Sequence, residues 1–271
     1  MKQPLVSVVM PVCNSEEYVS LAIESVLHQT YPDFEFIIVN DCSTDGSLAI
    51  LEKWAKKDPR IILLKNKQRL GISGSRNAGL ARAKGKLIMN MDHDDICHPG
   101  RMRLQVQYLE RHPDVGIVGC DIDVINADGR VIGERCFPKD DASIRKLLLQ
   151  YSPFTHPSTM VRSEAYARAG KYDKGFEPAD DYELYFRIGK LHKFGNLSAH
   201  LLKHRIHGSA TTMKKTRLMI CKTLKAKWQG VSMLGYAPGL HAVLVALGQL
   251  FSLILPSFAL EKIVLSQYKM K

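Results

Sequence analysis

Asp92, His93, Asp94 and Asp95 directly follow the apolar run 87–91, and their types and spacing suit them to chemistry. Side chains two positions apart on an extended backbone point the same way, so Asp92 and Asp94 can face one ligand. Carboxylate oxygens suit Mg²⁺ or Mn²⁺, which typically keep some waters and share the remaining positions with phosphate oxygens. The motif therefore predicts a divalent-cation site for a phosphate-bearing substrate. The structural alternative is an acidic turn that caps the next helix.

Two upstream segments have residues that suit nucleotide binding. Asp41 follows the apolar run 34–39, and its carboxylate can accept hydrogen bonds from a base or from ribose hydroxyls; the alternative is an Asx turn with a helix cap. Arg76 stands in the glycine-rich segment 71–79, on the first turns of a predicted helix, where a guanidinium can reach a phosphate or the base; the alternative is a surface salt bridge. The segment lacks the Gly-Lys-Ser/Thr ending of a P-loop and is not G-x-G-x-x-G, so ATP hydrolysis and dinucleotide binding are unsupported.

Two groups in the second half suit acid–base or phosphate chemistry. Asp180 and Asp181 stand at a predicted helix start, where the dipole favours the ionised form, so one of them could act as a general base; the alternative is an N-cap. His204 and His207 are three positions apart on a predicted strand and so point to opposite faces. We therefore do not expect both to bind one ion, although one can reach a diphosphate or its metal.

The elements that must position these residues alternate in the first half of the chain. We expect strands over 5–10, 34–39, 61–64 and 87–91, and helices over 19–27, 47–57, 75–83 and 99–111, with Asn14 and Glu17 at cap spacing before the first helix. This order predicts βαβ units and a parallel sheet. Because ligands bind at the carboxyl ends of parallel strands, residues 11–14, 40–43 and 92–95 should be neighbours.

The second half is more mixed. We expect strands over 115–122, 158–161 and 197–206, helices over 142–150 and 182–191, and a hairpin turn at Asp128-Gly129. An α/β domain over residues 1–208, followed by a helical C-terminal segment over 209–271, is the simplest partition.

The charge balance is basic, with 38 Lys and Arg against 27 Asp and Glu, a net charge of +11. Six basic residues and no acidic one lie between Thr211 and Trp228, and no formal charge follows from Trp228 to Leu260. A basic segment before an uncharged apolar one is typical of a membrane-surface element, so we expect the inner leaflet as a partner and no nucleic acid. The alternative is a solvated helix followed by a core helix.

The apolar run 240–255 ends before Pro256, and four polar or small residues recur in it at helical spacing. A membrane span needs about 20 apolar residues, so this run is short. We expect a helix that lies in the membrane interface in preference to a true span, with packing against a partner subunit as a third possibility.

The spacing of the cysteines and the short N-terminal apolar run favour a location in the cytoplasm. The six cysteines are scattered with no C-x-x-C pair, as expected for reduced thiols. The first apolar run stops at Pro11, too short and without the cleavage pattern of a signal peptide. We expect a cytoplasmic protein, peripherally associated with the cytoplasmic face of the membrane.

Four segments, 6–16, 40–47, 74–79 and Asp92-x-Asp94-Asp95, occur in an order that closely resembles the family 2 glycosyltransferases with the GT-A fold. The resemblance covers about residues 4–208 and implies a Rossmann-like α/β fold, with a mostly parallel central sheet flanked by helices. It implies inverting transfer of a hexose or N-acetylhexosamine from a nucleotide-diphosphate donor, most often a UDP-sugar, with Mn²⁺ or Mg²⁺. The implied acceptor is a glycan or lipid-linked saccharide in cell-surface polysaccharide or lipopolysaccharide synthesis.

On the donor side, the resemblance implies a role for each matching position. The nucleotide pocket would be lined by Pro11, Val12, Asn14 and Glu16. Asp41 would bind the base and Arg76 would sit against the nucleotide. Asp92 would approach the ribose or the metal, and Asp94 would coordinate the metal. Arg205 and His207 match an Arg-x-His pattern near the donor phosphates, which places His207 within reach of the metal.

On the acceptor side, Asp181 matches the family's catalytic base, and the segment around His156 looks like the family's acceptor-side strand. Three positions depart from the usual pattern: Asn40 replaces an Asp, Cys13 an aromatic residue, and Asp180 a Glu. The shorter Asp180, also placed on the acceptor side, leaves the choice of base between it and Asp181 open.

The alternative function belongs to a different class: the protein would bind a nucleotide without transferring a sugar and would serve as a membrane adaptor of a glycan assembly complex. The presence of both Asp94 and Asp181 favours the enzyme, because an adaptor has no need of the pair. A sugar-nucleotide pyrophosphorylase is weakened by the lack of a Gly-rich, Lys-containing N-terminal loop.

Overall fold

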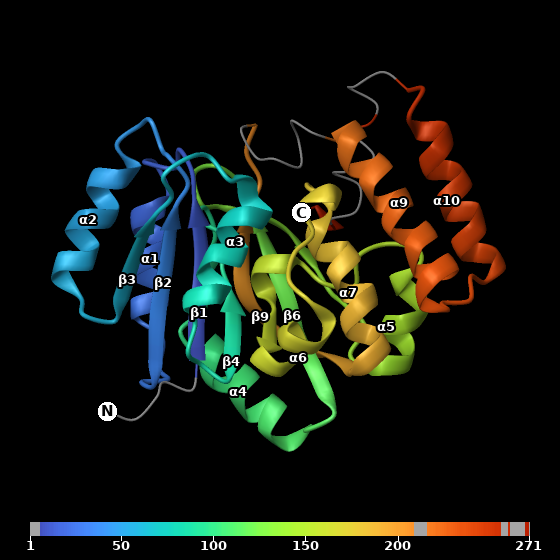
Figure 1. Cartoon of the computed structure of the whole chain (residues 1–271), viewed down its shortest axis with the longest axis horizontal. Helices are drawn as coiled ribbons and strands as arrows, with labels where there is room; N and C mark the ends of the chain where they lie inside the picture. Colours follow the sequence, from blue (N-terminus) through green and yellow to red (C-terminus); the bar gives the residue numbers. More distant parts are fainter. Residues whose placement is uncertain (1–5, 209–215, 256–259, 261–268, 271) are drawn as a thin grey trace.

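The computed structural model describes residues 6–208, 216–255, 260 and 269–270. Its N-terminal half is a parallel sheet in the order β3-β2-β1-β4, with helices packed against it (Figure 1). The strands are β1 (Val6–Val12), β2 (Phe34–Asn40), β3 (Ile61–Lys65) and β4 (Leu87–Asn90), and the helices are α1 (Val19–Leu27), α2 (Ser47–Lys57) and α3 (Gly71–Arg82). Every residue of β1, β2 and β4 is buried, which explains their nearly continuous apolar sequences.

The C-terminal half extends the sheet with mixed pairing. Strand β8 (Met160–Arg162) lies antiparallel to β4 and to β6 (Val115–Ile125), which also pairs with β7 (Val131–Arg135) and β9 (Lys193–Arg205). Two short strands, β5 (Ile96–Cys97) and β10 (Lys269–Met270), pair with β9 and β7. The prediction of a mostly parallel sheet therefore needs correction for this half: β6 and β9 are parallel, but β8 pairs antiparallel with both of its neighbours. The short hairpin that joins β6 to β7 forces antiparallel pairing there as well.

The helices of this half cover the sheet and lead into the C-terminal segment. They are α4 (Arg101–Arg111), α5 (Asp141–Leu148), α6 (Ser163–Ala169), α7 (Asp180–Leu191), α9 (Thr216–Leu234) and α10 (Leu240–Ser252), with short 3₁₀ turns η1 (His156–Ser158) and η2 (Lys174–Phe176). Helix α9 packs against α7 and η2, and α10 packs against α9 as the outermost element at the right of Figure 1. Within the described residues, no helix combines the length and apolarity needed to cross a membrane.

Most predicted elements are present within a few residues, with instructive differences. The helix over 47–57 and the turn at Asp128-Gly129, where Gly129 has φ +84°, are confirmed. The predicted cap of α1 is wrong: Tyr18 precedes the helix without a side-chain cap, and Asn14 Oδ1 instead accepts a hydrogen bond from Thr44 N at 2.8 Å. Helix α3 begins at Gly71 rather than 75, and Gly79 brings it close to β1, because a Cβ there would lie 2.5 Å from Val9.

The basic side chains of α9 contact the protein more than the sequence pattern suggests. Lys222 donates to Gly175 O at 2.8 Å, and Lys225 lies 4.4 Å over the Phe176 ring. Lys227 is buried and donates to Gln150 O, so burial lowers its pKa to about 8. Leu5, the first residue of the first predicted strand, lies outside the described residues. The same holds for Lys214 and Lys215 of the basic segment and for Pro256.

Candidate active site

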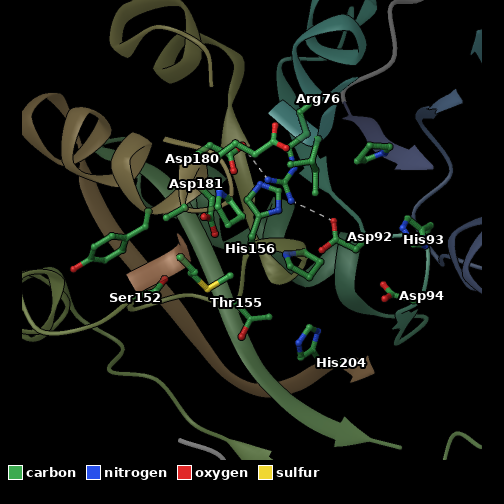
Figure 2. A pocket seen from close by; sticks show the side chains of 18 of the residues that line it. Arg76, Asp92, His93, Asp94, Ser152, Thr155, His156, Asp180, Asp181 and His204 are labelled. Atoms are coloured by element: carbon green, nitrogen blue, oxygen red, sulfur yellow. Dashed lines mark hydrogen bonds and ion pairs between the residues drawn. The ribbon is translucent and has the colours of Figure 1, made fainter. Parts of the chain in front are cut away.

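A cavity of about 690 Å³ opens where β1, β2 and β4 end, and α3, α7 and α9 complete its walls. Figure 2 shows Asp180 and Asp181 on one side, Asp94 and His204 on the other, and Arg76 with Asp92 between them. The structure brings together nearly all of the predicted site residues in its lining: Pro11, Val12, Asn14, Asp41, Arg76, Asp92, Asp94, His156, Asp180, Asp181, Arg205 and His207.

Glu16 is the exception, and its role in the nucleotide pocket stays a prediction. Its side chain is exposed, and Oε2 accepts a hydrogen bond from Gly46 N at 2.6 Å, outside the lining of the cavity. Glu16 therefore holds the loop that leads into α2. The sequence could not distinguish lining the nucleotide pocket from holding this loop, because both roles place a carboxylate just after β1.

Asp41 connects β2 to the start of α3. Its Oδ1 accepts hydrogen bonds from Asn66 Nδ2 at 2.7 Å and Leu70 N at 2.8 Å, and its Oδ2 accepts one from Gly71 N at 2.9 Å. A carboxylate has about four acceptor positions, so these three bonds leave little spare capacity. Asp41 thus positions the glycine-rich segment as well as lining the cavity.

Arg76 is the electrostatic centre of the site. It is buried, not on the surface, and its guanidinium lies 3.2 Å from Asp180 Oδ2 and 3.4 Å from Asp92 Oδ1. Burial alone would lower the pKa of Arg76, but Asp180 and Asp92 outweigh it and raise the pKa above its usual value. Arg76 therefore ties the acidic start of α7 to the acidic loop after β4, two segments far apart in sequence.

Arg76→Met is expected to lower the free energy of unfolding by about 3–5 kcal/mol, because it leaves buried Asp180 without its counter-charge. Urea denaturation measures the change. Adding Asp180→Asn should recover part of the loss, since it removes the uncompensated charge. Arg168→Met is the matched control: its pair with Glu164 spans 3.7 Å with both side chains more than half exposed, so a loss of under about 1 kcal/mol is expected. Equal losses in the two Arg variants would contradict this role of Arg76.

Asp94 lies at the opposite end of the cavity beside His207. Its Oδ2 is 2.9 Å from His207 Nε2. Burial alone would raise the pKa of Asp94, but the hydrogen bond from His207, together with His93 and His204, outweighs burial and lowers the pKa to about 2. Asp94 therefore carries a full negative charge at neutral pH, next to an imidazole.

Asp95 holds β9 against the loop after β4. It is fully buried and accepts hydrogen bonds from Arg205 N at 2.9 Å and from His204 Nδ1 at 3.1 Å. The Arg205 side chain donates to Asp94 O at 2.8 Å. These bonds fix the end of β9, which is what delivers His207 to Asp94.

Asp180 and Asp181 have different environments although they are adjacent. Asp180 is fully buried against Arg76, whereas Asp181 is half-buried and faces the cavity. Burial, followed by the negative charge of Asp180, raises the pKa of Asp181 to about 6. Of the two, Asp181 is the group suited to accept a proton near neutral pH.

His156 belongs to a buried polar cluster behind Arg76. Its Nε2 lies 2.8 Å from the Tyr172 hydroxyl, which is itself 2.8 Å from the Tyr166 hydroxyl. Asn90 Nδ2 donates to Tyr166 at 3.0 Å. Burial, together with the nearby Arg76 charge, holds the pKa of His156 well below its usual value, so His156 is neutral.

Helices α9 and α10 contribute a wall of the cavity that was not predicted from the sequence. Thr216, Met219, Ile220 and Thr223 line the cavity at spacings of three and four, so they form one face of α9, and Gln249 of α10 joins them. This spacing was visible in the sequence. Without the contact between α9 and α7, however, nothing indicated which face meets the cavity.

The family described as Glycosyl transferase family 2 matches residues 7–170, more than half of the chain. The protein therefore belongs to glycosyltransferase family 2 and is a sugar-transferring enzyme. It is 32% identical over 214 residues to an O-antigen biosynthesis glycosyltransferase of Escherichia coli, over 76% of this chain and 82% of that protein.

Solved structures have the same fold. S. aureus TarS in complex with UDP-GlcNAc aligns with a TM-score of 0.65 at 17% identity, over 92% of this chain and 80% of TarS. A mannosyltransferase of Pyrobaculum calidifontis in complex with GDP-Man and Mn²⁺ aligns with a TM-score of 0.64 at 17% identity, over 96% and 83% of the two chains. The GT-A fold implied by the sequence is thereby supported.

Proposed function

We propose that this glycosyltransferase inverts the anomeric centre as it moves a hexosyl or N-acetylhexosaminyl group from a nucleotide-diphosphate donor, a UDP-sugar by family resemblance, to a saccharide acceptor. One observation carries the proposal: Asp94 and Asp181 face the same cavity with pKa values of about 2 and about 6. Carboxyl groups whose environments separate their pKa values are typical of sites that divide charge stabilisation from proton transfer.

The donor's nucleoside would bind at the ends of β1 and β2. Pro11, Val12, Asn14 and Asp41 line the cavity there, at the carboxyl ends of parallel strands where α/β folds bind nucleotides. The solved relatives in complex with UDP-GlcNAc and GDP-Man support a nucleotide-sugar donor without deciding the base.

Asp94 is the proposed metal ligand. An ionised carboxylate beside the imidazole of His207 suits Mn²⁺ or Mg²⁺, and the Mn²⁺ complex of the P. calidifontis enzyme supports such a cation. Asp92 Oδ1 turns toward Arg76, so Asp92 is proposed to serve the ribose or to act as a lesser ligand. A bound cation would neutralise the charge that develops on the departing diphosphate.

Asp181 is the proposed general base. It would accept the proton of the acceptor hydroxyl while that oxygen attacks the anomeric carbon, on the face opposite the bond to the diphosphate, so the configuration inverts. Asp180 would position Arg76 and raise the proton affinity of Asp181 through its charge. Neutral His156 also lines the cavity and is proposed to border the acceptor.

A donor screen by thermal shift tests the proposal. With Mn²⁺ and a donor at about one hundred times its Kd, binding adds about 2.7 kcal/mol to the free energy of unfolding. For a chain of this size that corresponds to a rise in Tm of about 5–10 °C. UDP-sugars should give the largest rise, compared with GDP- and dTDP-sugars, and EDTA should reduce it. Stabilisation by none of these donors would count against the proposed donor class.

We also propose that residues 1–208 form the catalytic domain and that 209–271 hold it on the anionic cytoplasmic leaflet, where a lipid-linked acceptor of polysaccharide synthesis would be presented. Helix α10 turns Ala242 and Ser252 inward, whereas Leu244, Leu247 and Phe251 are 58%, 55% and 63% exposed. Leu240 and Ile254 continue this outer face, which we call the α10 apolar face. An apolar face that points away from the protein, on a chain of net charge +11, suits an anionic lipid surface.

Leu244→Glu with Leu247→Glu should abolish most binding to vesicles that contain anionic lipid. Burying each leucine is worth roughly 1.5–3 kcal/mol, so losing two predicts at least a tenfold weaker partition. Vesicle flotation measures the bound fraction. Leu21→Glu, at a leucine that is 48% exposed on α1, is the matched control and should float like the wild type. Unchanged flotation of the α10 variant would contradict the membrane proposal, and a concentration-dependent change in its oligomeric state would instead favour a partner subunit.

A further inference from the structure

Three side chains that can bind a metal ion meet on neighbouring strands, apart from the residues proposed for catalysis. Asp121 lies in β6, Cys136 directly follows β7, and His200 lies in β9. One carboxylate oxygen, the thiol sulfur and one ring nitrogen all lie within 4.8 Å of one another.

The sheet itself builds this juxtaposition. Strand β6 runs between β7 and β9; Asp121 is the register partner of His200, and Ile122 is that of Arg135. Because β6 and β7 are antiparallel, Cys136 falls opposite Asp121, which gives one row of three residues across three strands. Neighbours in such a row point to the same face of the sheet.

A fourth residue orients the imidazole. Asp123, two positions along β6 on the same face, has its Oδ1 2.8 Å from His200 Nδ1. A carboxylate at Nδ1 favours the tautomer with the proton there, which leaves the Nε2 lone pair available. His200 Nε2 lies 4.0 Å from Cys136 Sγ, so the lone pair faces the thiol. A carboxylate behind a ligating histidine is the usual arrangement at protein zinc sites.

Asp121 retains an oxygen for a ligand. Phe137 N at 2.8 Å and Lys139 Nζ at 2.5 Å both donate to Oδ1. No hydrogen bond from the described residues goes to Oδ2, so this oxygen can bind a cation while Oδ1 keeps its partners.

We propose that Asp121, Cys136 and His200 bind a zinc ion, with water as the fourth ligand. A thiolate, an imidazole and a carboxylate suit Zn²⁺, whereas the carboxylate-rich end of the catalytic cavity suits harder cations. Zn²⁺ sits about 2.0–2.3 Å from such ligands, so modest side-chain rotations would bring the three together.

The zinc site would stabilise one wall of the catalytic cavity. Arg135, next to Cys136, lines that cavity and donates to Ser152 O at 3.2 Å, and Ser152 lines it as well. An ion that links β6, β7 and β9 would fix the end of β7, and with it Arg135 in the cavity wall.

Cobalt titration of the reduced, metal-free full chain tests the proposal, because Co²⁺ bound to a thiolate gives a charge-transfer absorption that Co²⁺ on carboxylates and imidazoles lacks. One equivalent of Co²⁺ should produce this band, and Zn²⁺ should displace it. Cys136→Ser should abolish the band and His200→Gln should weaken binding at least tenfold. Asp123→Ala, which removes only the orienting carboxylate, should weaken binding about 10–100-fold.

Two cysteine controls make the result specific. Cys221→Ser, at an exposed cysteine of α9, and Cys13→Ser, at a cysteine that lines the catalytic cavity, should leave the band unchanged. Asp94→Ala should leave it unchanged as well, which separates this site from the proposed catalytic metal. Absence of the band in the wild type, or its persistence in Cys136→Ser, would overturn the proposal.

Discussion

Asp181→Asn is expected to lower kcat/KM by about 10²–10⁴-fold, because the amide cannot accept the proton of the acceptor hydroxyl. Donor affinity should stay near that of the wild type, since Asp181 is proposed to contact the acceptor and not the donor. Steady-state kinetics together with donor titration measures both quantities. Transfer at wild-type rate in this variant would exclude Asp181 as the base.

The pH dependence provides the internal control for this substitution. The base works only when ionised, and its pKa is about 6, so wild-type kcat/KM should fall as the pH drops below about 6. Asp181→Asn should lose this limb of the profile. An unchanged acid limb in the variant would assign it to another group.

The same substitution should stabilise the fold at neutral pH. The folded protein holds the proton of Asp181 more tightly than the unfolded chain does, because the pKa of Asp181 is about 6 when folded and near 4 when unfolded. The free energy of unfolding therefore falls as the pH rises from about 4 to about 6. Above pH 6 the native state carries the cost of a partly buried charge. Asp181→Asn should therefore gain on the order of 1–3 kcal/mol at pH 7 and nothing at pH 4.

Asp94→Ala is expected to have the second large effect. Without this carboxylate the proposed cation site loses its ionised ligand, and transfer should fall by about 10²–10³-fold, since electrostatic stabilisation of the leaving group is worth several kcal/mol. The apparent Mn²⁺ affinity, measured by titrating Mn²⁺ into the transfer assay, should weaken in parallel.

Asp128→Ala is the control for Asp94→Ala. This aspartate is exposed at the turn between β6 and β7 and has no place in the cavity, so both activity and Mn²⁺ affinity should stay at wild-type values. If Asp94→Ala kept wild-type activity with the same Mn²⁺ dependence, the metal assignment would fail. A loss of activity that higher Mn²⁺ concentrations partly restore is the expected pattern.

The part of the cavity formed by the strand ends could be predicted from the sequence because local rules suffice there. Buried strands with continuous apolar runs, followed by polar turns, place residues 11–14, 40–43 and 92–95 at one edge of the sheet, and Pro11, Asp41 and Asp94 all line the cavity. Glu16 lies outside this lining. Its neighbour across the turn, Gly46 N, satisfies the carboxylate, and a single sequence gives no register for that pairing.

The remaining features depend on contacts between distant segments. Arg76 and Asp180 are 104 positions apart, so their ion pair could not be inferred from spacing. The antiparallel insertion of β8 between β4 and β6 was also hidden, because β8 is short and lacks a distinctive period. Helix α10 buries its small and polar side and exposes its apolar side, because the polar side packs on α9, where Gln249 Oε1 accepts a hydrogen bond from Lys227 Nζ at 2.7 Å.

The anomeric configuration of the first product tests the central claim most directly. The donor with the largest thermal shift, with its sugar α-linked to the diphosphate, is incubated with the protein and Mn²⁺, with water as the acceptor, and followed by proton NMR before the free sugar equilibrates. Single displacement assisted by Asp181 predicts that the β-anomer appears first, and that Asp181→Asn suppresses its release. Initial appearance of the α-anomer would contradict the inverting mechanism and the role of Asp181 as its base.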